Sequence, residues 1–89
     1  VALHGAGGSE NLFFEGYGAG HIVTECRKRG WLLVATRSGL AFGGGPPVPA
    51  VLDELAKRYP LDPKRAFVVG HSMGAMQTID LVQKHPGRF

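Results

Sequence analysis

Three short runs of the chain are apolar almost throughout. They cover residues 1–4, 31–36 and 66–70. A continuous apolar run of this length is typical of a strand whose two faces are both covered, as in a parallel sheet. We therefore expect three strands at these places.

Between and after these runs, apolar residues recur every three or four positions, which is the spacing of one helical face. The pattern predicts three helices, over residues 19–29, 48–59 and 73–82. Boundary residues agree with these ranges, because Gly30 is placed to end the first helix and Pro60 to end the second. The alternation of strand and helix predicts an α/β fold with a parallel sheet.

The apolar faces of the helices are expected to lie in the core. In the last helix this face is formed by Met73, Met76, Ile79 and Val82. Cys26 falls on the apolar face of the first helix, so we expect it to act as a small buried hydrophobe and not as a reactive thiol.

The connections between the strands limit the topology. Right-handed crossovers keep successive helices on one face of the sheet until the winding direction reverses. With the strand order second–first–third, the first helix covers one face and the other two cover the opposite face, which gives three layers, α/β/α. The reversal then falls between the carboxyl ends of the first and third strands, the crevice in which open α/β sheets bind ligands.

The third strand ends in GHSMG, residues 70–74, which fits the pattern G-x-S-x-G between a strand and a helix. A serine at the apex of so sharp a turn takes a strained backbone, at a cost of about 1–3 kcal/mol. Gly70 and Gly74 relieve the crowding as the chain folds back on itself. The oxygen of Ser72 then stands at the positive end of a helix dipole, and the amide of Met73 points to where an oxyanion would form.

The first strand also ends in small residues, HGAGG at residues 4–8. An oxyanion hole needs a second donor about 3 Å from the same point. The amide of Ala6 is the simplest candidate, because small residues let the backbone come close. His4 fits as the residue that organises this turn. Both strand tips point at the same crevice, so they predict one site.

These segments resemble the central part of an α/β-hydrolase-fold serine hydrolase, close to esterases and to the prolyl-oligopeptidase-like branch. The resemblance is carried by LHGAGG, DPKRAFVVGHSMGA and KHPGRF, and it covers essentially all of residues 1–89 as one partial domain. It implies an incomplete α/β-hydrolase fold with no metal and no organic cofactor. It implies that Ser72 is the nucleophile and that Met73 and Ala6 supply the two oxyanion amides. It also implies that Gly5 and Gly7 shape the oxyanion loop and that Gly70 and Gly74 are the glycines of the nucleophile elbow.

In that family the acidic residue and the histidine follow the serine along the chain. We therefore expect both beyond Phe89, in the remainder of a longer parent chain, and little or no activity from residues 1–89 alone, because a serine without a base is a poor nucleophile. The histidines of this chain are expected in other roles: His4 in the loop, His71 as a structural neighbour of the serine, and His21 and His85 on helices. Asp80 is expected to be a solvated carboxylate.

The first hypothesis for function is hydrolysis of carboxylic esters by acyl transfer through Ser72. A peptidase of the prolyl-oligopeptidase type is the alternative within the enzyme class, since the motifs around the serine do not separate esters from amides. A non-catalytic α/β-hydrolase-like binding module, or an inactive truncated fragment, is the alternative from another class. The expected partner is a small-molecule ester or peptide substrate.

Composition narrows these hypotheses further. The 89 residues are 44% hydrophobic and 19% charged, which is typical of one small globular domain. The net charge is +3, and the basic residues are spread along the chain. Their one tight cluster, residues 27–29, is more typical of a helix end than of a surface that binds nucleic acid. No apolar run approaches the length of a membrane helix, and no phosphate-binding glycine motif is present.

The predicted second strand is followed by a loop that contains three consecutive glycines, Gly43, Gly44 and Gly45.

Overall fold

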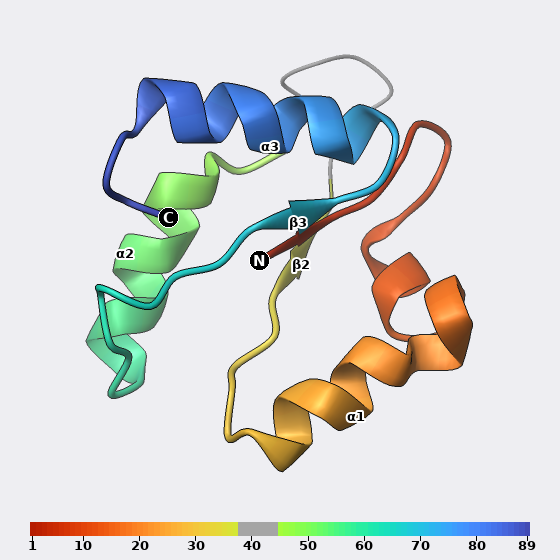
Figure 1. Ribbon diagram of the computed structural model, residues 1–89, viewed down its shortest axis with the longest axis horizontal. Coiled ribbons are helices and arrows are strands. Elements are labelled where there is room, and N and C mark those ends of the chain that lie inside the picture. The colour runs from red at the N-terminus through yellow and green to blue at the C-terminus, as the bar shows by residue number, and fades with distance from the viewer. Residues whose placement is uncertain (38–44) are drawn as a thin grey trace.

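The computed structural model describes residues 1–37 and 45–89, so Gly43 and Gly44 of the predicted loop lie outside the described residues. Three parallel strands form one sheet: β1 (Ala2–Leu3), β2 (Ala35–Thr36) and β3 (Val69–Gly70). The strand order is β2-β1-β3, which confirms the predicted order second–first–third (Figure 1). In register, Ala2 lies opposite both Ala35 and Val69. The fold class is α/β.

All three predicted helices are present, as α1 (His21–Lys28), α2 (Val48–Arg58) and α3 (Met73–Lys84). Gly30 ends α1 with φ 65°, and the N–H of Trp31 returns to the carbonyl of Cys26 at 2.9 Å. Two 3-10 turns that the periodicity did not predict precede α1: η1 (Glu10–Phe13) and η2 (Tyr17–Gly20).

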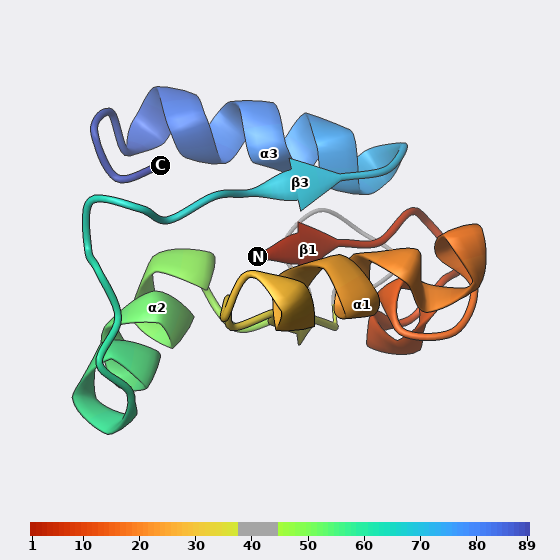
Figure 2. The same cartoon turned by 60° about the horizontal axis from the view of Figure 1, so that its bottom comes forward.

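The helices lie around the sheet in an arrangement that differs in part from the prediction. Helix α3 packs along β3 and β1, and α1 lies on the other side of the strands (Figures 1 and 2). Helix α2 was predicted to share a face with α3. It lies instead beside the amino ends of the strands, and among the described residues it packs on no strand as closely as α3 does.

The strands are shorter than the apolar runs that predicted them. The N–H of Ala2 bonds to the carbonyl of Val34 at 2.8 Å, and the N–H of Val69 bonds to the carbonyl of Val1 at 2.9 Å. The outer strands can pair only where β1 runs beside them, so the residues before Val34 and before Phe67 have little or no strand to pair with. The side chains of Trp31 and Phe67, in the segments that lead into these strands, are 44% and 56% exposed.

The buried core is small and sits at the centre of the sheet. Its apolar members are Ala2, Leu3, Phe13, Val48 and Met73. The prediction that the whole apolar face of the last helix is buried was wrong beyond its first turn. No element of the described chain packs closely on the rest of that face, where three side chains are exposed: Met76 at 58%, Ile79 at 60% and Val82 at 45%.

Candidate active site

Ser72 occupies the turn between β3 and α3 with φ 55° and ψ −117°. A positive φ is rare for a residue with a Cβ and costs on the order of 1–3 kcal/mol. Serine is a favoured N-cap because its oxygen can accept from the helix amides, yet the side chain of Ser72 makes no capping hydrogen bond to α3. The side chain is exposed. The strained turn that the sequence predicted is present, and its hydroxyl is left available.

The two glycines of the motif are required by close backbone approaches. A Cβ on Gly70 would overlap the carbonyl of Gly74, within the turn itself. A Cβ on Gly74 would overlap the carbonyl of Leu3, where the first turn of α3 rests on β1. Any larger residue at either position would push the helix away from the strand. The helix therefore starts close above the end of β1.

The loop of residues 4–8 folds back beside Ser72. Gly8 donates its N–H to the carbonyl of Gly5 at 3.1 Å, which closes a tight turn, and Gly7 within it takes φ 73°. A Cβ on Gly5 would lie 3.3 Å from the Cβ of Ser72, so the loop passes at van der Waals distance from the serine. The structure thus brings together the two strand tips that the sequence assigned to one site.

Two backbone amides are available at this junction. Within the described ranges 1–37 and 45–89, neither the N–H of Ala6 nor that of Met73 donates to a protein acceptor. Met73 is the first residue of α3, so its N–H lies at the positive end of the helix dipole. Unused donors at such a position are the groups that stabilise a developing negative charge.

His4 is buried beneath the loop, with a relative exposure of 1%. Its Nδ1 lies 2.7 Å from the carbonyl oxygen of Gly5. Because a carbonyl oxygen only accepts, Nδ1 carries the proton and donates it. His4 therefore holds the turn from below, which agrees with the organising role expected of it.

His71 lies next to Ser72 along the chain, whereas His21, His85 and Asp80 interact with other parts of the described chain. Nδ1 of His71 lies 3.0 Å from the hydroxyl of Tyr17, His21 lies 3.5 Å from Glu25, and His85 caps the end of α3. Asp80 pairs with Lys84 at 2.9 Å along one face of α3. Within the described residues no histidine or carboxylate is hydrogen-bonded to the Ser72 hydroxyl.

Sequence reasoning missed Tyr17, which the structure places at the centre of the junction. Its hydroxyl lies 3.4 Å from the N–H of Gly5 and 3.0 Å from the ring of His71. It therefore contacts both strand tips. An aromatic residue within the small-residue stretch GYGAG, residues 16–20, was the available signal.

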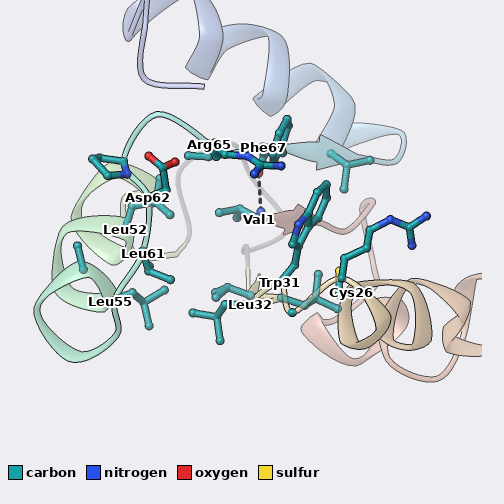
Figure 3. A pocket seen from close by; sticks show the side chains of 18 of the residues that line it. Val1, Cys26, Trp31, Leu32, Leu52, Leu55, Leu61, Asp62, Arg65 and Phe67 are labelled. Atoms are coloured by element: carbon teal, nitrogen blue, oxygen red, sulfur yellow. Dashed lines mark hydrogen bonds between the residues drawn. The ribbon is translucent and has the colours of Figure 1, made fainter.

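A hollow of about 810 Å³ lies around Val1, at the amino ends of the strands (Figure 3). Its walls are mainly apolar, and Trp31 stacks on Phe67 beside it with ring centroids 5.1 Å apart. The N-terminal nitrogen of Val1 donates to the carbonyl of Phe67 at 2.6 Å in the same region. Cys26 is the one thiol in the lining. With neither Ser72 nor the 4–8 loop in its walls, this hollow is not the candidate active site.

No three metal-ligating side chains come together in the described part of the chain. None of the helices described is both long and apolar enough to cross a membrane. Comparison with known proteins gave no match, either to a family model or to a curated protein.

Proposed function

We propose that this chain carries the nucleophile and the oxyanion hole of a serine hydrolase that acts on carboxylic esters. The observation that carries the proposal is the backbone of Ser72, held at φ 55° without using its hydroxyl to cap the helix that it begins. Backbone strain of this kind is concentrated at functional sites, where the rest of the structure holds it in place. A merely structural turn at this position would favour glycine.

The arrangement supports acyl transfer. The hydroxyl of Ser72 attacks the ester carbonyl, a C–O bond forms, and a general base takes the serine proton. The carbonyl oxygen becomes an oxyanion, which the amides of Met73 and Ala6 stabilise. Collapse of this intermediate breaks the bond to the alkoxide, which takes the proton from the base. Water then hydrolyses the acyl-serine by the same steps.

The mechanism requires a histidine hydrogen-bonded to the Ser72 hydroxyl and a carboxylate behind it, and the described residues supply neither contact. We propose that both come from the remainder of the parent protein. They would approach from the solvent side of the crevice, where the Ser72 side chain is exposed. The same segments would supply most contacts to the acyl and alcohol groups.

Hydrolysis of p-nitrophenyl acetate by the full-length protein tests the proposal. We expect Ser72→Ala to lower kcat by at least about 10³-fold, because loss of the nucleophile removes the covalent route. Thr24→Ala removes an exposed hydroxyl from α1 and should leave kcat unchanged. Turnover that survives Ser72→Ala would refute the proposal. Faster cleavage of the matching p-nitroanilide than of the ester would assign the site to a peptidase instead.

A further inference from the structure

We propose that Tyr17 is a positioning residue that holds the 4–8 loop against the Ser72 turn and so aims the Ala6 amide at the oxyanion. The inference rests on the function proposed above and adds a residue that the motifs do not include. Tyr17 opens η2, far along the chain from the serine turn and separated from His71 by 54 positions. Its contacts nevertheless reach both halves of the site.

The hydroxyl of Tyr17 joins the two halves by hydrogen bonds. Its oxygen accepts the N–H of Gly5 at 3.4 Å, and it pairs with Nδ1 of His71 at 3.0 Å. A phenol has lone pairs and one proton, so it can accept from the amide while donating to an imidazole nitrogen. The loop and the serine turn are thereby held at a fixed separation by one side chain.

The bonds around Gly5 determine the direction of the Ala6 N–H. The carbonyl of Gly5 accepts from His4 at 2.7 Å and from Gly8 at 3.1 Å. Since a trans peptide is planar, with its C=O and N–H on opposite sides, bonds to this carbonyl also orient the N–H of Ala6. Tyr17 accepts the N–H of Gly5, which belongs to the preceding peptide. The peptides on both sides of Gly5 are therefore held by hydrogen bonds.

Ring packing keeps the phenol in place. The Tyr17 ring lies 4.9 Å from the His71 ring, and the buried Phe13 ring meets it edge-on at 4.8 Å and 76°. Edge-to-face aromatic pairs at these distances are favourable. The hydroxyl can therefore be removed without removing the contacts that place the ring.

The backbone that carries Tyr17 is itself strained. Ala19 takes φ 52°, and Gly18 and Gly20 take φ 56° and 73°. A Cβ on Gly20 would overlap the carbonyl of Phe14, so the turn is closely packed as well. The left-handed conformation of Ala19 and the close packing at Gly20 fix the backbone that follows Tyr17.

Kinetics of the full-length Tyr17→Phe protein test the inference. We expect kcat for p-nitrophenyl acetate to fall about tenfold, since a donor slightly out of place loses part of its effect. KM should stay unchanged, and the unfolding midpoint should fall only slightly, because the ring and its packing are kept while the hydrogen bonds of the hydroxyl are lost. Tyr59→Phe is the matched control, because Tyr59 is exposed at the end of α2, and it should behave as wild type.

A second variant tests the partner of Tyr17. In a His71→Ala background, Tyr17→Phe should cost less than it does in the wild-type protein, since the two side chains act through one contact. Wild-type kcat in Tyr17→Phe, or a kcat that falls only because less of the protein is folded at the assay temperature, would overturn the positioning role while leaving the hydrolase proposal intact. Activity that survives Ser72→Ala would overturn both.

Discussion

At the scale of single residues, the backbone conformation that places the Ser72 hydroxyl in the candidate site also destabilises the fold. Ser72 has a side chain at a backbone conformation, φ 55° and ψ −117°, that glycine adopts with less strain. The hydroxyl stands clear of the sheet only because the turn is held there from both sides. Gly74 rests on the carbonyl of Leu3, and the backbone of Gly5 comes so close that a Cβ there would lie 3.3 Å from the Cβ of Ser72.

Ser72→Gly should be more stable than Ser72→Ala, although both lose the hydroxyl. The glycine variant relieves the strain of the positive φ, and part of this gain is offset by the greater freedom of glycine in the unfolded chain, which leaves about 1 kcal/mol. The free energies of unfolding from urea titrations of the two variants provide the comparison. Equal stabilities would mean that the backbone of residue 72 is unstrained.

Gly74→Ala should destabilise the protein by about 3 kcal/mol, because its Cβ overlaps the carbonyl of Leu3 and helix α3 must move away from β1. Gly87→Ala is the control, since Gly87 has φ 81° but nothing near its Cβ, and it should cost only about 1 kcal/mol. Chemical denaturation of both variants measures the difference. If Gly74→Ala is no worse than Gly87→Ala, the close approach does not exist.

The residues of the candidate site differ in how far they could be predicted. Ser72 and Ala6 could be proposed as site residues because each stands in a short local pattern at the tip of an expected strand. Tyr17 could not, because its proposed role depends on His71, 54 positions away, and on the unusual turn of residues 18–20. Contacts between distant segments leave no spacing in the sequence that a local pattern could detect.

At the scale of elements, the ends of the helices are determined by local interactions that can be recognised in the sequence. Gly30 and Pro60 mark where α1 and α2 end, and the observed boundaries follow them closely. Strand lengths could not be predicted in this way. The run of residues 31–36 is apolar throughout, but only Ala35 and Thr36 lie beside β1 and pair with it.

Helix α1 also contains a charge cluster that predicts a dependence of stability on pH. Arg29 and Lys28 bind the carboxylate of Glu25 and lower its pKa, and the charge of His21 lowers it further. A lowered carboxyl pKa stabilises the folded chain at pH values above the ordinary carboxyl range. This stabilisation is lost as the pH falls through the lowered pKa.

Glu25→Gln should therefore lower the unfolding temperature at about pH 7, and this effect should shrink as the pH falls toward about 2, because the carboxyl of the wild type becomes protonated. Glu15→Gln is the control, because Glu15 is exposed and has no ion pair within the described residues, and it should have no effect at either pH. Thermal unfolding followed by circular dichroism supplies the data. A Glu25→Gln effect of the same size at both pH values would exclude the ion pairs as its cause.

At the scale of the whole molecule, the described chain leaves much apolar surface in water. Met76 and Ile79 are exposed on α3, and Trp31, Phe67 and Val69 are exposed along the outer strands. Exposed apolar side chains and an uncovered strand edge both favour association. The described residues bury few apolar side chains, and many others are exposed to solvent.

We expect residues 1–89 alone to associate as their concentration rises through the micromolar range, and to bind an apolar dye. Replacing Met76 and Ile79 with lysine should reduce both effects without loss of helix, since lysine is a good helix former. Sedimentation equilibrium and dye fluorescence measure the two properties. A chain that stays monomeric and binds no dye at every concentration would show that these side chains are covered.

The central claim, that Ser72 is a nucleophile, is tested most directly by covalent labelling. The full-length protein would be treated with a fluorophosphonate, digested, and analysed by mass spectrometry. A reactive serine forms an O–P bond and releases fluoride, so we predict one adduct per chain, on the peptide that contains Ser72, and none in Ser72→Ala. A folded, full-length protein that carries no adduct on Ser72 would contradict the account.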